Sequence, residues 1–298
     1  MFRSVYVKQN SVTIPFTTSE SWTILSPIEQ SIKRKIEAVG TPLKDWDIKI
    51  NRGILTGCND AFIISSEKRN EILLNCKTDR EYNSTAELIR PILRGKDIKR
   101  YSYHFADQWL IATFPSRHYD IENYPAVRDY LLTFDKRRLA QTGEKNIDGI
   151  KGNNARKRTN NQWFETQDSI SYWDDFSKQK IVWSDLMRIT KDASSEFPRF
   201  TLIEEEIMLT NTAYFIVGTD IEWLIDALNS KIAAYFFLQN VTMFDNGGLR
   251  MFRQFIEEFP VPAKCGELAL SNIYGFTDKE KEYIVSFILN RITEIQNR

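Results

Sequence analysis

The chain has 298 residues, and its 40 basic and 40 acidic side chains balance, so no overall positive charge indicates a nucleic-acid partner. Hydrophobic residues make up 42% of the chain, enough to form a core and to exclude general disorder. The cysteines (Cys58, Cys76 and Cys265) are few and far apart, which excludes a disulfide framework and a Cys-x-x-Cys zinc site. Because the sequence contains no long apolar run, we expect a cytoplasmic protein without membrane partners.

The first predicted helix begins after Ser26 and ends at Gly40. Ser26 is a capping serine, Pro27 occupies the first helical position, and Glu29 stands three residues after the cap. The apolar residues at helical spacing are Ile28, Ile32, Ile36 and Val39. Residues 1–18 alternate only loosely and are predicted to form an edge strand or an ordered tail.

Short β-like runs and capped helices alternate through the rest of the chain. A helix is predicted from Tyr124 through Leu139, one from the cap at Thr219 through Phe236, and a last one from Thr277 onward. The β-like runs are 46–50, 61–64, 71–74, 108–114, 180–184, 200–203 and 214–217. This order predicts an α+β fold, a mixed twisted β-sheet core with packed helices and helical terminal segments.

No motif for catalysis is complete. The segment Arg52–Gly57 contains two glycines but lacks the pattern of a phosphate-binding loop. Asp47 and Asp97 each precede an Ile-Lys pair, as in some magnesium nucleases, yet no Pro-Asp dipeptide supplies the second acidic ligand. His104 and His118 are not accompanied by a recognisable nucleophile motif. We therefore expect no catalytic residue and no metal site in this chain.

Positive charge gathers between residues 86 and 160, where basic side chains outnumber acidic ones. Phosphate contacts by such residues provide sequence-independent affinity for DNA, while Arg–guanine and Asn/Gln–adenine pairs read base edges. We predict that four residues position the DNA backbone: Arg94, Lys96, Lys99 and Arg100. We predict that six residues of the polar loop 141–162 approach base edges: Arg156, Lys157, Arg158, Asn160, Asn161 and Gln162.

Two alternatives remain open at this point. The polar loop also has the composition of a solvated, flexible segment. The aromatic pairs Trp163-Phe164 and Tyr172-Trp173 are typical of core packing, and stacking on an extruded base is the more specific interpretation.

Several blocks occur in the order found in a known family. The first are Pro42–Trp46, Arg52–Phe62 and Ile92–Tyr101. The later blocks are Lys180–Trp183, Asn211–Ile216, Leu228–Lys231 and Phe259–Pro262. Over about residues 20–262 the chain resembles the TaqI-like C-terminal specificity domain of type IIG restriction–modification enzymes and related adenine-N6 DNA methyltransferases. The block around Arg94 belongs to the family signature, so packing alone could also account for it.

The resemblance implies sequence-specific target recognition on double-stranded DNA, with catalysis in a methyltransferase domain or subunit that binds S-adenosylmethionine. The chain contains no Pro-Pro dipeptide, which the adenine-gripping motif of that methyltransferase requires. We therefore expect no cofactor and no methyltransferase activity in this chain. The expected division is 1–40 as N-terminal segment and connector helix, 41–262 as target-recognition domain and 263–298 as C-terminal helical extension. The alternative is a protein-interaction or assembly subunit of a DNA-modification complex.

Overall fold

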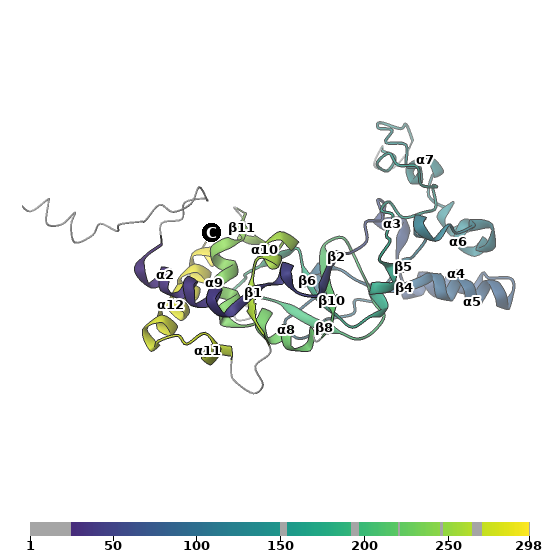
Figure 1. Ribbon diagram of the computed structural model, residues 1–298. Coiled ribbons are helices and arrows are strands. Elements are labelled where there is room, and N and C mark those ends of the chain that lie inside the picture. Colours follow the sequence, from purple (N-terminus) through teal and green to yellow (C-terminus); the bar gives the residue numbers. More distant parts are fainter. Residues whose placement is uncertain are drawn as a thin grey trace, which may run out of the picture.

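The computed structural model describes residues 25–149, 154–191, 197–219, 221–244, 247–263 and 270–297 (Figure 1). The prediction for residues 1–18 lies outside these ranges. At the centre is an antiparallel sheet in the order β2-β10-β6-β8. Its strands are β2 (Ile48–Arg52), β10 (Ala213–Gly218), β6 (Lys180–Ser184) and β8 (Phe200–Ile203). The corresponding β-like runs of the sequence are thereby confirmed.

This central sheet separates two hydrophobic cores. Successive side chains of a strand point to opposite faces. Ile181 and Trp183 of β6 accordingly lie in the first core, while Val182, between them, lies in the second. In β10, Ile216 lies in the first core and Phe215 in the second. Both faces of the sheet are therefore covered.

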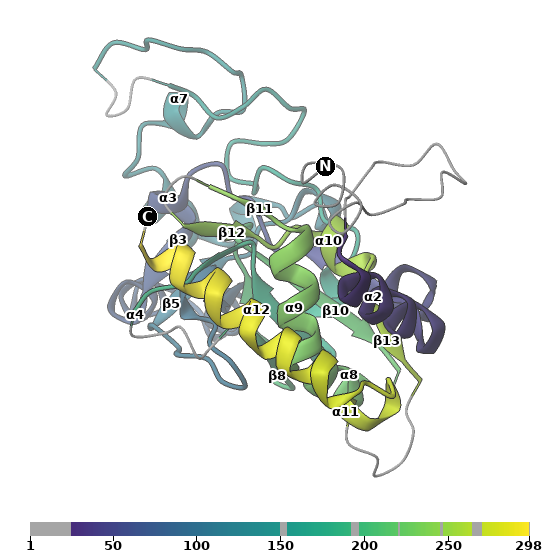
Figure 2. The same cartoon turned by 90° about the vertical axis from the view of Figure 1, so that its left-hand side faces the viewer.

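The first core is formed largely by helices, and Figure 2 shows α9 and α12 running side by side. The helices of this half are α2 (Pro27–Val39), α8 (Ile221–Leu228), α9 (Lys231–Asn240), α10 (Arg253–Glu257), α11 (Leu270–Ile273) and α12 (Asp278–Gln296). Two small sheets accompany them, one with β1 (Gly40–Pro42) and β13 (Pro260–Pro262), the other with β11 (Thr242–Met243), β12 (Gly248–Arg250) and β7 (Leu186–Arg188).

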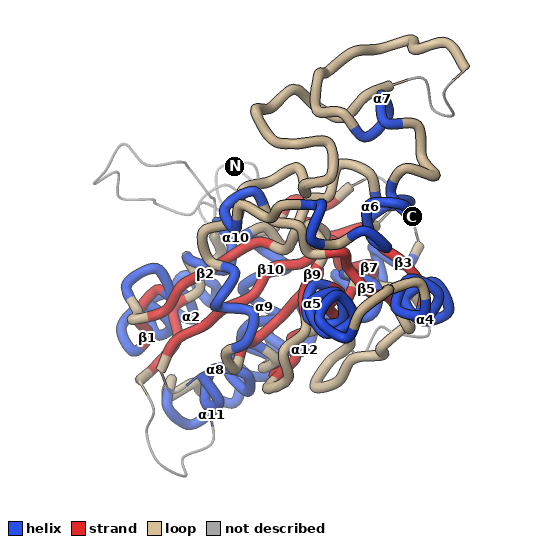
Figure 3. Tube along the Cα trace, turned by 90° about the vertical axis from the view of Figure 1, so that its right-hand side faces the viewer, coloured by secondary structure: helices blue, strands red, loops and turns tan. Residues whose placement is uncertain are grey.

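The second core lies between the central sheet and a mixed sheet in the order β3-β5-β4-β9, seen from that end in Figure 3. Its strands are β3 (Ile63–Ser65), β5 (Gln108–Ile111), β4 (Ile89–Leu93) and β9 (Met208–Leu209). Its helices are α3 (Asn59–Phe62), α4 (Ser66–Leu74), α5 (Asp79–Leu88), α6 (Pro125–Leu131) and α7 (Lys136–Leu139). Short 3-10 turns are η1 (Leu43–Asp45), η2 (Gly95–Asp97), η3 (Pro115–Arg117), η4 (Ile121–Asn123) and η5 (Trp173–Ser177). The predicted α+β class with a mixed sheet is confirmed.

Four predicted elements differ from the structure. The predicted β-like run 61–64 begins in helix α3 and enters strand β3 only at Ile63. Residues 71–74 are the end of helix α4 and not a strand, because the Ser65 side chain caps the helix and only Ile72 and Leu73 of the apolar run are buried. A run of four apolar or charged residues does not by itself distinguish a buried strand from a helix. The helix predicted through Leu139 is interrupted after α6, and the helix predicted through Phe236 is divided into α8 and α9, where Ser230 caps the second.

The terminal helices α2 and α12 pack into the same core and contact each other through Glu280. Capping boxes are present at Ser26, where one was predicted, and at Thr277, where the last helix was predicted to begin. The box predicted at Thr219 includes Asp220, which lies outside the described residues. Glu280 accepts hydrogen bonds from the Ser31 hydroxyl at 2.7 Å and from the Lys35 ammonium at 2.6 Å. The helices predicted as connector and extension thus form one packed unit with the central sheet. None of the described helices has the length and apolar character that a membrane span requires.

Glu280→Gln is expected to lower the free energy of unfolding at neutral pH by about 2 kcal/mol, because hydrogen bonds to charged groups are lost. Burial raises the pKa of Glu280, but the Lys35 ammonium and the Thr277 and Ser31 groups outweigh it and hold the pKa at about 2. A depressed folded-state pKa contributes stability above the unfolded value, which is lost as the pH falls toward the folded one. Urea unfolding of both proteins from pH 7 to pH 2 measures this pH-dependent difference in the free energy of unfolding. A difference between the two proteins that stays constant over this range would contradict the account.

Candidate nucleic-acid interface

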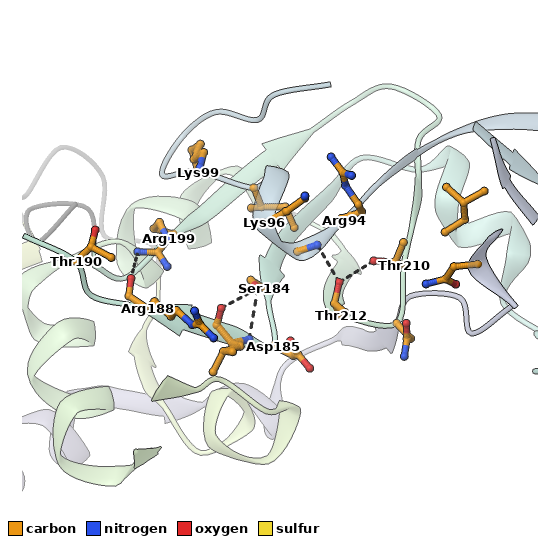
Figure 4. A pocket seen from close by; sticks show the side chains of 16 residues that line it. Arg94, Lys96, Lys99, Ser184, Asp185, Arg188, Thr190, Arg199, Thr210 and Thr212 are labelled. Carbon is orange, nitrogen blue, oxygen red and sulfur yellow. Dashed lines mark hydrogen bonds between the residues drawn. The ribbon is translucent and has the colours of Figure 1, made fainter. Parts of the chain in front are cut away.

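A cleft of about 590 Å³ opens where the β4–η2 corner faces the β6–β7 corner (Figure 4). Of the described residues that line it, five are basic and one, Asp185, is acidic. The lining residues are Asn59, Ile63, Arg94, Gly95, Lys96, Ile98, Lys99, Ser184, Asp185, Leu186, Arg188, Thr190, Arg199, Thr210, Asn211 and Thr212. The protein chain is neutral as a whole, so this cleft concentrates positive charge locally.

The first wall of the cleft is the β4–η2 corner, which an internal ion pair holds in shape. Arg94 donates from Nε and Nη2 to the two oxygens of Asp97 at 2.8 and 2.9 Å, and its backbone N–H donates to the same carboxylate. Burial raises the pKa of Asp97, but these bonds outweigh burial and keep the pKa below its usual value. Arg94 therefore has a structural partner, whereas Lys96 and Lys99 are exposed.

Gly95 is required by the packing at this corner. It is buried, and a Cβ at this position would lie 2.5 Å from the Thr212 carbonyl oxygen and 2.6 Å from the Ser184 hydroxyl. Its N–H donates to the Thr212 hydroxyl at 3.0 Å. The glycine therefore lets the first wall sit directly on the floor of the cleft.

Arg100 is not among the residues that line the cleft. Its Nη2 donates to the Asn229 carbonyl at the α8–α9 junction at 2.7 Å, and its guanidinium lies 5.3 Å from the centre of the Tyr101 ring. Asn229 in turn exchanges two side-chain hydrogen bonds with the backbone of Phe200. Arg100 thus bonds to the protein backbone in this structure, and its phosphate contact stays a prediction.

The second wall comes from β7 and from the start of β8, and sequence reasoning missed it. Arg188 is exposed at the end of β7, and Arg199 donates to its carbonyl oxygen at 3.1 Å. These two arginines lie eleven positions apart and belong to no basic run. Only the folding of the chain places them opposite the Lys96 corner (Figure 4).

Residues 140–162, here called the arm, extend from the second half of the protein next to α7 (Figures 1 and 2). Of the arm, residues 140–149 and 154–162 are described. Its two sides are joined by backbone hydrogen bonds, including Gly143 N–H to the Arg156 carbonyl at 2.9 Å and Ala155 N–H to the Glu144 carbonyl at 2.9 Å. The described parts are thus a folded-back loop with internal pairing.

Arg156 lies inside this structure and does not face solvent, although the sequence suggested a base contact. Only 4% of the residue is exposed. Its guanidinium donates to four backbone carbonyls, those of Leu139, Thr56, Glu165 and Trp163, at 2.6–2.9 Å. Burial lowers the pKa of Arg156 to about 10, so the group remains charged at neutral pH. Its role is to fasten the arm, which corrects the prediction for this residue.

The other predicted arm residues divide into internal and exposed ones. Asn161 is half-buried, and its amide donates to the Gln167 carbonyl at 2.9 Å, so it too shapes the arm. Arg158 is exposed while its Nε donates to the Thr142 carbonyl at 3.0 Å, which leaves other guanidinium donors directed outward. The remaining exposed side chains are Lys157, Asn160 and Gln162.

The aromatic pairs near the arm pack within the protein. Trp163 and Phe164 meet edge to face with ring centres 5.7 Å apart, and Tyr172 contacts Phe176 and Phe215 of the second core. The structure therefore favours core packing over base stacking for these residues.

Arm and cleft share a boundary at Asn59 of α3. Asn59 lines the cleft and also lines a smaller cavity at the base of the arm, together with Arg138, Asn154 and Arg156. The two basic regions are thus neighbours on the surface.

Metal chemistry receives no support from the described residues. These contain no group of three or more His, Cys, Asp or Glu side chains that could hold a metal ion. Asp97 is committed to Arg94, and Asp47 is exposed.

Comparison with known proteins assigns the family. The family model of the TaqI-like C-terminal specificity domain matches residues 90–261, more than half of the chain. The chain therefore belongs to this family, and its function is DNA target recognition.

Two solved structures are similar at low identity. The type IIG restriction endonuclease BpuSI shares 14% identity at a TM-score of 0.46, covering 88% of this chain and 27% of its own. The type IIL restriction-modification enzyme MmeI in complex with DNA shares 9% identity at a TM-score of 0.42, covering 86% of this chain and 33% of its own. The chain thus spans only about a quarter to a third of these proteins. The search of curated proteins found no match.

Proposed function

We propose that this chain recognises the target sequence on double-stranded DNA for an adenine-N6 methyltransferase, and that the arm and the adjoining cleft form its DNA-binding face. The observation that carries the proposal is the placement of the basic cleft beside the base of the arm, in a chain without net charge. Membership of the specificity-domain family supports DNA as the partner.

The two regions have different parts in this proposal. Lys96 and Lys99 are exposed lysines on a wall that the Arg94–Asp97 pair holds rigid, and a lysine ammonium contacts phosphate as a point charge without reading sequence. Arg158, Asn160 and Gln162 carry donors and acceptors that can pair with base edges in the major groove. The cleft would hold the backbone while the arm reads.

Catalysis is assigned to a methyltransferase domain or subunit that joins this chain. That partner would bind S-adenosylmethionine and supply the methyl-transfer chemistry. This chain's contribution is to select the site by positioning the duplex.

Lys96→Gln/Lys99→Gln is expected to weaken binding of a mixed-sequence duplex and to lower the slope of log affinity against log salt by about two, since each lost phosphate contact removes about one released counterion. Fluorescence anisotropy between about 50 and 200 mM NaCl measures this. Lys279→Gln/Lys281→Gln is the matched control, because these exposed lysines open α12 at the end of the molecule remote from the arm (Figures 1 and 2). Absent or salt-insensitive binding by the unaltered protein would contradict the proposal.

A further inference from the structure

We propose that Arg188 and Arg199 form the second half of a clamp that holds the phosphodiester backbone of one DNA strand in the cleft. This inference rests on the proposed function and assigns it two residues outside the basic segment 86–160. The clamp consists of Lys96 and Lys99 on one wall and the two arginines on the other.

The two walls are both hydrogen-bonded to Thr212, which forms the floor of the cleft. Gly95 of the first wall donates to the Thr212 hydroxyl, and Asp185 at the start of the second donates its N–H to the Thr212 carbonyl at 2.9 Å. Strand β7 is paired on its other side with β12, where Arg188 lies opposite Gly248. The basic side chains are therefore carried on paired strands and a tight turn, a geometry that is set before a ligand arrives.

The described lining of the cleft carries more basic than acidic side chains. Asp185 is the only carboxylate among the described lining residues, and Arg250 approaches it at 3.4 Å. Burial raises the pKa of Asp185 above its usual value, and Arg250 offsets this only in part. Arg199 bonds to the carbonyl of Arg188, which keeps two guanidinium groups on the same short wall. A phosphate between the walls would accept hydrogen bonds from cationic side chains of both walls.

The lining favours phosphate over an extruded base as the occupant. Sites for unpaired bases stack them on aromatic rings, and no aromatic side chain occurs among the described residues that line this cleft. Arginine matches phosphate by donating two parallel hydrogen bonds. The volume of about 590 Å³ is in the range of sites for molecules of nucleotide size. A strand backbone with its sugars fits both the charge and the space.

The test compares duplex binding by the full chain and by two double variants. Arg188→Gln/Arg199→Gln is expected to weaken binding of a fluorescein-labelled mixed-sequence duplex roughly tenfold and to lower the salt slope by about two. Arg188→Lys/Arg199→Lys retains both charges and is expected to keep the slope of the unaltered protein. Circular dichroism and thermal unfolding establish that each variant is folded. If the double glutamine variant does not fold, the single variant Arg188→Gln, at an exposed position, replaces it.

The outcomes separate this inference from the proposed function. If the glutamine variant binds with unchanged affinity and slope while Lys96→Gln/Lys99→Gln weakens binding, the second wall does not contact DNA and the clamp is refuted. If the unaltered chain shows no salt-dependent binding, the proposed DNA face itself fails. A lysine variant as defective as the glutamine variant would assign the arginines to packing and would also overturn the clamp.

Discussion

Arg156→Ala is expected to lower the free energy of unfolding by about 3 kcal/mol or more, the largest effect of any single arm residue. The substitution leaves four backbone carbonyls without the guanidinium that now satisfies them, and each unsatisfied buried polar group costs about 1–3 kcal/mol before water enters. It also removes the contact with the Phe62 ring, whose centre is 4.9 Å away. Urea denaturation measures the change, and hydrogen exchange locates it at the contacts of residues 139, 56, 163 and 165.

Arg158→Ala is the matched control. It is an arginine two positions away that is exposed and donates a hydrogen bond to the Thr142 carbonyl. Its loss is expected to change stability by less than about 0.5 kcal/mol, as is usual for surface substitutions. Equal destabilisation by the two variants would show that Arg156 does not fasten the arm.

The second large effect is expected in the DNA sequence that is selected. Replacing Lys157, Arg158, Asn160 and Gln162 with alanine should reduce methylation of the target word by about 100-fold or more, because each bidentate base contact contributes about 1–3 kcal/mol of discrimination. The measurement joins the chain to its methyltransferase region and maps N6-methyladenine over a plasmid of known sequence. Residual methylation is expected at DNA sequences that differ from the original recognition sequence at the positions read by the arm.

A transfer experiment complements that loss. Exchanging residues 141–173 for the corresponding segment of a family member with another specificity should change the methylated word. An unchanged word would refute the assignment of base reading to the arm, while leaving the backbone contacts of the cleft in place. Lys279→Gln/Lys281→Gln again serves as the control, with an unchanged word and unchanged efficiency.

The sequence by itself determined the local elements and the family. The capping boxes at Ser26 and Thr277 are local hydrogen-bond patterns, and the structure has both. The strands at 180–184, 200–203 and 214–217 follow from their apolar and β-branched composition. The ordered signature blocks identified the specificity domain, which the family match confirms. Helix α5 was not predicted, because its ten residues include few large apolar side chains.

Only the tertiary structure decided which charged residues face outward. Arg156 and Lys180 are charged residues of the kind usually found on the surface, yet both are buried. Arg156 donates to four backbone carbonyls. The Lys180 ammonium donates to the carbonyls of Phe176, Lys178 and Glu205. Burial and the positions of hydrogen-bond partners arise from contacts between distant segments of the chain, and local composition does not reveal these contacts. The same reason explains the cleft: Lys96, Arg188 and Arg199 become neighbours only because the β4–η2 corner rests on the β6–β7 corner through Gly95 and Thr212.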